Sequence, residues 1–286
     1  MKKNHSFNMC RIGNVQRRRF ATGVAVILCW LGLAIEADAT YVSTVTGDNP
    51  VAYWRLGEAA NTDPAADEIA PTVDGSYTSG ISVGLQGIPG AAPNTSVGFD
   101  NSSNVRFPDN DKFDFGTGDF SIEAWAKTPD TDQPDRIIAK DDGAGWQIRI
   151  ESRDGRADTN KGLFFIRGGG AETSVVSTSD VNDDQWHHLV TVRESGELTL
   201  YVDGVPEVTG VAFANSADSA NDLFIGTFNN ASGNAAFAGL IDETALYTHA
   251  LSPTQVAAHY AAGIPEPATL VLLIGGAALL VHLKRR

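Results

Sequence analysis

The chain has 286 residues, and 21 Lys and Arg against 35 Asp and Glu give it a formal net charge of −14. Residues 40–267, between two apolar ends, carry 33 acidic and 12 basic residues, a net charge of −21. This charge excludes a nucleic-acid partner, because phosphate contacts need a basic patch, and it favours cation binding.

The first 39 residues have the three parts of a secretory signal peptide. Six Lys and Arg precede an apolar run from Ala21 to Ile35, and the small residues Ala37-Asp38-Ala39 follow it. The apolar run, about 15 residues, is shorter than the roughly 20 that span a bilayer, which favours a cleaved leader over an anchor. Arg17-Arg18-Arg19-Phe20 also allows twin-arginine export, so the export route stays open. We expect the mature chain to begin near Thr40 without cysteine, because both cysteines lie in the leader.

Residues 40–263 are predicted to form one all-β domain, an antiparallel two-sheet sandwich. Apolar and polar residues alternate in short segments that are separated by Gly, Asn and Asp. In 120–127 the even positions form the core face, and the odd positions, including Glu123 and Trp125, form the other face. Asp203-Gly204 predicts a tight hairpin, since a type I′ turn needs positive φ at both central residues. Strands are predicted at 51–57, 95–100, 104–107, 120–127, 136–140, 145–151, 162–167, 173–178, 186–193, 198–205, 222–227 and 237–247, and a helix at 253–260.

Four motifs in this domain resemble a known family. They are AYWRLGE at 52–58, FSIEAWA at 120–126, QWHHLVTV at 185–192 leading into LYVDG, and GLIDETALY at 239–247 followed by ALSP. In this order, over roughly residues 50–262, they are similar to laminin-G-like domains of the concanavalin A-like lectin/glucanase superfamily. The resemblance implies a jelly-roll sandwich. It does not by itself imply sugar binding, because one fold hosts many functions.

The chain ends on Pro265-Glu266-Pro267, an apolar segment at 268–283 and the basic residues Lys284, Arg285 and Arg286. This order resembles the PEP-CTERM sorting signal of Gram-negative bacteria, which an exosortase processes. The resemblance implies a transmembrane helix at 268–283, transient anchoring in the inner membrane, and export to the cell surface or extracellular matrix. The apolar segment is short for a span, but Lys284 can extend its reach by snorkelling. A retained anchor is one alternative, and a buried C-terminal helix fits the basic end less well.

Calcium (Ca²⁺) is the cofactor that this composition favours, because the ion takes six to eight oxygen ligands. Glu58 ends the first strand and Asp242 lies in the last, so neighbouring first and last strands would bring the two carboxylates together. The resemblance implies that loop carbonyls complete such a site, here around Asp74 and Gly75. The alternative is that these acids are solvated. His187-His188 is predicted to be structural, since neighbours on a strand point to opposite faces.

The chain is predicted not to be an enzyme. Glycoside hydrolysis needs two carboxyl groups, about 5–5.5 Å apart for retention or 6.5–9.5 Å for inversion. Glucanases of the superfamily carry glutamates at alternate positions of one strand, whereas Glu123 has Trp125 two positions on. Asp242 and Glu243 are strand neighbours and are predicted to point to opposite faces. A glycan hydrolase is therefore the weakest alternative.

Carbohydrate binding is the leading hypothesis. Aromatic rings bind the apolar face of a sugar, while amides and carboxylates bind its hydroxyls. Trp125 with Glu123, and Trp146, are predicted to form the floor of a groove, with Asn229 and Asn230 in a rim loop. The predicted protein is an adhesion module that binds extracellular polysaccharide in a biofilm matrix. The alternatives are aromatic residues packed under loops, and a structural or protein–protein interaction domain without a sugar site.

Overall fold

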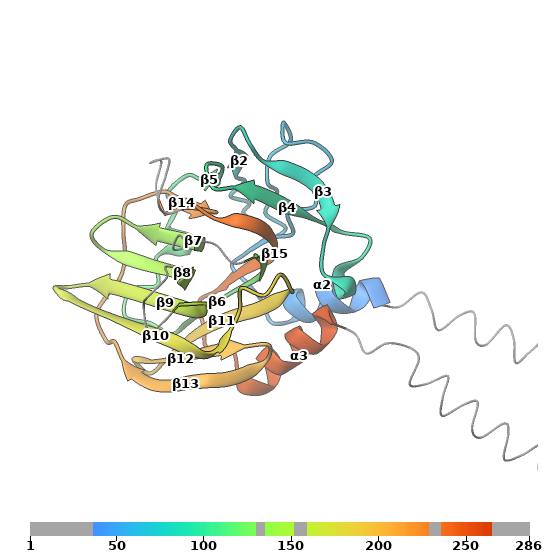
Figure 1. Cartoon of the computed structure of the whole chain (residues 1–286). Helices are drawn as coiled ribbons and strands as arrows, with labels where there is room; N and C mark the ends of the chain where they lie inside the picture. Colours follow the sequence, from blue (N-terminus) through green and yellow to red (C-terminus); the bar gives the residue numbers. More distant parts are fainter. Residues whose placement is uncertain (1–36, 130–134, 152–158, 229–235, 265–286) are drawn as a thin grey trace, which may run out of the picture. The chain divides into compact units, whose positions relative to one another are not determined.

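The computed structural model describes residues 37–129, 135–151, 159–228 and 236–264. They form two antiparallel sheets packed as a sandwich (Figure 1), which confirms the predicted fold class. The predicted leader up to residue 36, Asn229, Asn230 and the sorting signal at 265–286 lie outside these residues. Within the described part of the chain, no helix has the length and apolar character needed to cross a membrane.

Fifteen strands, two α-helices and two short 3-10 helices make up the described chain. Their bounds are α2 Ala37–Gly47, β1 Ala52–Trp54, β2 Ser76–Tyr77, β3 Ser82–Gln86, η1 Pro89–Ala91, β4 Thr95–Asp100, β5 Val105–Phe107, η2 Asp111–Phe113, β6 Phe120–Lys127, β7 Asp135–Asp141, β8 Gly145–Glu151, β9 Lys161–Gly168, β10 Ala171–Asp180, β11 His187–Glu194, β12 Glu197–Val202, β13 Val205–Ala212, β14 Leu223–Ile225, β15 Ala238–Tyr247 and α3 Pro253–Gly263.

Strand β15 lies at the centre of the eight-stranded sheet, whose order is β13-β12-β11-β6-β15-β4-β3. Its first half pairs with β4, and its second half pairs with β1 through Ala52↔Leu246. The first and last strands are therefore neighbours, as predicted. The seven-stranded sheet has the order β10-β9-β8-β7-β14-β5-β2.

The main core lies between the two sheets and follows the predicted alternation. The even positions of β6, from Phe120 to Ala126, are all buried in it. The hairpin between β12 and β13 has φ of 52° at Asp203 and 78° at Gly204, which confirms the predicted turn. Strand alternation is a local signal, so it identifies these core residues without knowledge of the topology.

A second apolar cluster lies on the outer face of the eight-stranded sheet, beneath α2 and α3 (Figure 1). Helix α3 was predicted, and Ser252 begins it with a capping box to Gln255. Helix α2 was not predicted, because its β-branched residues have low helix propensity. Packing stabilises it instead, since Tyr41 and Val45, one helical turn apart, are both fully buried.

Candidate functional site

Trp125 and Glu123 project from the outer face of the eight-stranded sheet, as predicted, but neither is exposed to solvent. Nε1 of Trp125 donates a hydrogen bond of 2.7 Å to the hydroxyl of Tyr41 in α2. The indole ring also stacks on His188, at 4.7 Å between ring centroids, and on Tyr260 of α3, at 5.7 Å. The prediction that Trp125 and Glu123 form the floor of an open groove is therefore wrong, because two helices cover this face.

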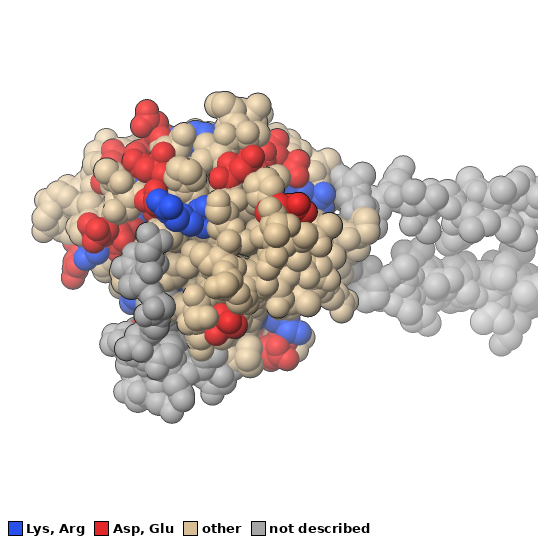
Figure 2. Space-filling view, turned by 90° about the horizontal axis from the view of Figure 1, so that it is seen from above, with Lys and Arg blue, Asp and Glu red and all other residues tan. Residues whose placement is uncertain are grey.

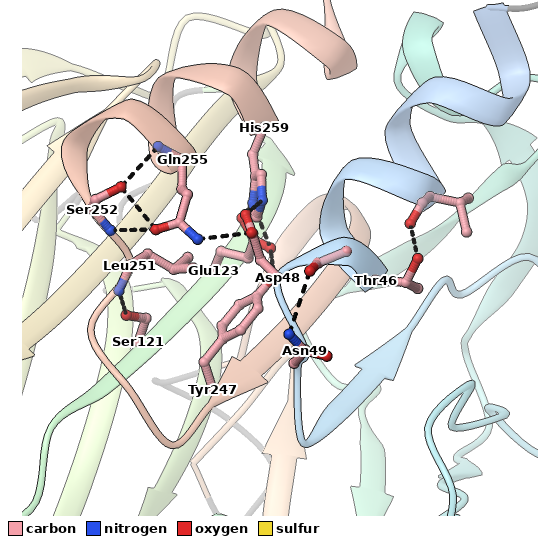
Figure 3. A network of polar contacts seen from close by, with 12 residues as sticks. Thr46, Asp48, Asn49, Ser121, Glu123, Tyr247, Leu251, Ser252, Gln255 and His259 are labelled. Atoms are coloured by element: carbon pink, nitrogen blue, oxygen red, sulfur yellow. Dashed lines mark hydrogen bonds and ion pairs between the residues drawn. The ribbon is translucent and has the colours of Figure 1, made fainter.

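Glu123 is the centre of a buried polar network (Figure 3). Its Oε1 accepts a hydrogen bond from the hydroxyl of Tyr247. Its Oε2 lies 2.9 Å from Nε2 of His188 and 2.9 Å from Nδ1 of His259. Nε2 of His259 lies 2.9 Å from Oδ2 of Asp48, just after α2. A doubly protonated His259 therefore donates to a carboxylate on each side.

Both partners of the Glu123–His259 pair are ionised at neutral pH. Burial disfavours the charge of His259, but the carboxylates of Glu123 and Asp48 outweigh it and raise the pKa of His259 to about 9. Burial also opposes the charge of Glu123, but His259 and His188 lower its pKa well below the usual range. The pair joins α3 to β6 under apolar cover, so its role is structural.

A second group of carboxylates lies where β1 meets β15. A β-bulge between Asp242 and Ala245, with Glu243 at φ of 48°, interrupts the strand alternation. Nδ2 of Asn94 consequently donates to both carboxylates, at 3.3 Å to Asp242 Oδ1 and 3.0 Å to Glu243 Oε1. The prediction that Asp242 and Glu243 point to opposite faces is wrong for this reason.

The carboxylates of Asp242 and Glu243 are buried, and Arg55 is the basic side chain beside them. Glu243 accepts hydrogen bonds from the hydroxyl of Tyr53 and, at 3.3 Å, from Nε of Arg55. Asp242 accepts one of 2.9 Å from the backbone N–H of Ile88. Burial raises the pKa of Glu243 to about 7, although Arg55 opposes this. Burial and then the charge of Glu243 raise the pKa of Asp242 well above its usual range.

Arg55 and Asn94 also line an open pocket of about 450 Å³. An overlapping pocket of about 180 Å³ shares Arg55, Gly57, Glu58 and Asn94 and adds Glu68. A Cβ on Gly57 would lie 1.9 Å from Oδ1 of Asn94, so a larger residue there would displace the Asn94 amide. The carboxylates of Glu58 and Glu68 thus line the pocket, and those of Asp242 and Glu243 lie buried beside Asn94.

The predicted calcium ligands are only partly brought together. Backbone N–H groups of residues 65–67 donate to the carbonyl of Gly75 and to the carboxylates of Glu58 and Asp74, at 2.9–3.0 Å. Asp242 instead bonds to Asn94, which lines the pocket together with Glu58. Among the described residues, no group of three or more His, Cys, Asp or Glu side chains is placed to hold a metal ion.

Trp146 faces inward from β8 and is 1% exposed. Its ring packs against Phe115 in the main core, at 5.8 Å between centroids. The prediction that Trp146 helps to form a sugar-binding floor is wrong, because strand alternation turns it toward the other sheet. The predicted rim residues Asn229 and Asn230 are not among the described residues.

A half-buried aromatic and polar surface lies instead on the outer face of the seven-stranded sheet, where Asp141 and Gln147 are buried and Phe165 and Arg167 are partly exposed. Phe164 and Ile166 of β9 are in the main core, so Phe165 and Arg167 project outward. In the sheet register Phe165 lies between Gln147 of β8 and Ser174 of β10. We name this the Phe165 surface, and it consists of Asp141, Gln147, Arg149, Phe165, Arg167 and Ser174.

The polar groups of the Phe165 surface are held by hydrogen bonds to one another. Asp141 accepts hydrogen bonds from Nε of Arg167, at 2.7 Å, and from Nε2 of Gln147, and Nη2 of Arg167 also lies 2.6 Å from it. Nε of Arg136 donates to Oε1 of Gln147 at 3.3 Å. This surface was not predicted from the sequence, although the same alternation that places Trp146 and Phe164 inward predicts Gln147 and Phe165 outward.

The sequence of this sandwich matches a known family. Residues 99–257 match the family model described as the concanavalin A-like lectin/glucanases superfamily, so the chain belongs to this family. A curated relative, the adhesion G-protein coupled receptor V1 of Danio rerio, is 23% identical over 142 residues. This match covers 48% of the present chain and 2% of the receptor.

Solved structures with low sequence identity share the fold. The binding domain of Paraclostridial Mosquitocidal Protein 1 is 16% identical with a TM-score of 0.60, over 74% of this chain and 52% of that one. Domain 4 of AbnA, an extracellular arabinanase from Geobacillus stearothermophilus solved with arabinotriose, is 18% identical with a TM-score of 0.55, over 74% and 98%. The botulinum neurotoxin type G receptor binding domain is 15% identical with a TM-score of 0.54, over 74% and 51%.

Proposed function

We propose that this protein is a non-catalytic carbohydrate-binding module that works outside the cell. The observation that carries the proposal is the Phe165 surface, where an outward aromatic ring lies beside amide, carboxylate and guanidinium groups. A sugar ring that packs on Phe165 would place its hydroxyls beside the partly exposed guanidinium of Arg167, which the buried Asp141 holds in place. Because these polar groups already bond to one another, little side-chain order is lost when a ligand binds.

The comparisons support a binding module in general terms. Two of the similar solved domains are described as a binding domain and a receptor binding domain, and the third, domain 4 of an arabinanase, was solved with arabinotriose. The positions of the carboxylates that were considered and rejected for catalysis from the sequence do not favour an enzyme. Glu123, Asp242 and Glu243 are fully buried, so none of them can flank a glycosidic bond of a polysaccharide.

The test is a binding screen of the purified protein against soluble polysaccharides, followed by Phe165→Ala. We expect Phe165→Ala to weaken binding up to about tenfold, since an aromatic contact is worth about 0.5–1.5 kcal/mol beyond its buried area. Trp125→Phe is the control, because Trp125 is buried and should affect stability only. No binding to any polysaccharide would instead favour a structural or protein–protein interaction domain.

The export and sorting of the chain are part of the same proposal. A leader ending at residue 39 and a PEP-CTERM tail predict an exosortase partner and a final position on the cell surface or in the extracellular matrix. Mass spectrometry of the protein from its native host tests this. We expect an N-terminus near Thr40 and loss of residues 268–286. An intact tail would favour a retained membrane anchor.

We also propose that Ca²⁺ binds to the domain and stabilises its fold. Glu58 and Glu68 line the pocket beside Asn94, and Asp242 and Glu243 lie buried next to Asn94 with Arg55 as a basic neighbour. No three of these carboxylates converge among the described residues, so a divalent cation would have to draw them together while it offsets their repulsion. Binding requires Glu58 to exchange hydrogen bonds from Ala66 and Tyr77 for the ion. We expect millimolar Ca²⁺ to raise the melting temperature, and Asp242→Asn to abolish the increase. An unchanged melting temperature would remove calcium from the proposal.

A further inference from the structure

Basic residues are distributed unequally between the two sheets. The strands of the eight-stranded sheet carry two basic residues (Lys or Arg) and seven acidic residues (Asp or Glu). The strands of the seven-stranded sheet carry six basic and five acidic residues. In a region with a net charge of −21, the seven-stranded sheet is where an anion meets the least repulsion. Its six basic residues are Arg106, Arg136, Lys140, Arg149, Lys161 and Arg167.

Two of these arginines lie over the ring of Phe165. The guanidinium carbons of Arg149 and Arg167 lie 5.9 and 5.8 Å from the centroid of Phe165. A sugar ring that contacts Phe165 therefore meets a guanidinium group together with the aromatic ring. Asp141 occupies the Nε and Nη2 atoms of Arg167, which fixes the guanidinium plane and leaves Nη1 for a ligand. The side chain of Arg167 is 32% exposed, so a ligand can reach it.

We propose that the ligand of the Phe165 surface is an acidic polysaccharide, with a sugar ring at Phe165 and a uronate carboxylate at Arg167. This inference rests on the proposed carbohydrate-binding function and specifies its ligand class. Guanidinium groups suit carboxylates because their planar N–H donors match the carboxylate oxygens. On the face seen in Figure 2, acidic side chains are more widespread than basic ones, and such a face repels an acidic polymer.

The test uses the full purified chain and three soluble polymers in the presence of a calcium chelator. They are polygalacturonate, the same polymer with its carboxylates reduced to alcohols, and poly-glutamate. We expect polygalacturonate to bind at least about tenfold more tightly than either of the others, and its affinity to fall as salt is added. Equal binding of the reduced polymer would overturn the acidic ligand but leave the carbohydrate-binding function intact. Equal binding of poly-glutamate would show charge attraction without sugar recognition and overturn the inference.

Arg167→Gln and Lys127→Gln form a matched pair of variants. Their side chains are 32% and 31% exposed, and each is ion-paired, Arg167 with Asp141 and Lys127 with Asp184. Each change removes one positive charge, but Lys127 lies on the other sheet. We expect Arg167→Gln to weaken polygalacturonate binding about tenfold and Lys127→Gln to change it less than about twofold. Equal effects of the two would overturn the inference.

Two further variants distinguish a loss of ligand binding from a folding defect in Arg167→Gln. Arg167→Lys keeps the charge but loses the planar donors, and we expect it to recover only part of the affinity. Phe165→Leu keeps an apolar side chain without the aromatic face, and we expect it to weaken binding of polygalacturonate while the melting temperature stays near that of the parent chain. Full affinity in a well-folded Phe165→Leu would show that no sugar stacks on Phe165 and would contradict the proposed site.

Discussion

The hydroxyl of Tyr41 in α2 and Nε1 of Trp125 in β6 are joined by a buried hydrogen bond of 2.7 Å. Gly263, the last residue of α3, lies against the same indole ring. One tryptophan of the sheet thus contacts both α2 and α3. The two helices are therefore integral parts of the fold.

Gly263→Ala is expected to destabilise the protein. A Cβ at this position would lie 2.3 Å from Cζ2 of Trp125, and the buried ring has no room to move. Overpacking of this kind costs about 1–3 kcal/mol of unfolding free energy, measurable by urea denaturation. Gly47→Ala at the end of α2 is the control, because a Cβ on Gly47 would have no neighbouring atom within 4 Å. A loss in Gly47→Ala as large as that in Gly263→Ala would contradict this packing argument.

Removal of α2 is expected to be costly, whereas cleavage at the predicted leader site is not. A chain beginning at Thr40 keeps Tyr41, Val45 and Asp48. A chain beginning at Asn49 loses two fully buried side chains and one carboxylate partner of His259. We expect the shorter chain to lose at least about 3 kcal/mol of unfolding free energy. Thermal and chemical denaturation of both chains provide the measurement, and equal stabilities would refute the structural role of α2.

Glu123→Gln is expected to lower stability without affecting ligand binding. The change removes one of the two carboxylate partners of His259, whose positive charge then stays buried with Asp48 alone. Breaking a buried ion pair of this kind costs about 3–5 kcal/mol. Denaturation gives the loss, and polysaccharide affinity of the folded protein should be unchanged, since Glu123 lies beneath the helices. Reduced affinity with unaltered stability would place Glu123 in the binding site instead.

The raised pKa of His259 predicts how stability depends on pH. Its folded value of about 9 lies above its unfolded value of about 6.5, so the folded state holds the proton more tightly. The stabilisation is fully present below about pH 6.5 and is lost as pH rises through about 9, by roughly 3 kcal/mol at most. Denaturation between about pH 6 and 10 measures the slope. We expect His259→Gln to flatten it, and an unaltered slope in that variant would assign the pH dependence to other groups.

Most of the sandwich could be predicted because strand alternation is a local property. The core positions of β6 and the hairpin at Asp203-Gly204 follow from a few neighbouring residues each. What covers the outer face of a sheet depends on distant residues, so the burial of Trp125 under α2 did not follow from the sequence. A bulge is equally hard to predict, because the left-handed conformation of Glu243 has no distinct residue pattern.

The candidate site was missed for a different reason. Tryptophan rings often bind sugars, so Trp125 and Trp146 were predicted to do so. Both are large apolar side chains, and both are buried. Phe165 was overlooked because it stands next to Phe164, which is in the core. The opposite orientation of strand neighbours distinguishes the two phenylalanines once β9 is recognised.

Helices α2 and α3 cover the eight-stranded sheet, so they do not block the outer face of the seven-stranded sheet. The polypeptide enters the sandwich at α2 and leaves it at α3, both against the outer face of the eight-stranded sheet. Whatever tethers the domain through either helix is attached on that side. The Phe165 surface belongs to the opposite layer, so a long polymer can lie across it without meeting the points of attachment.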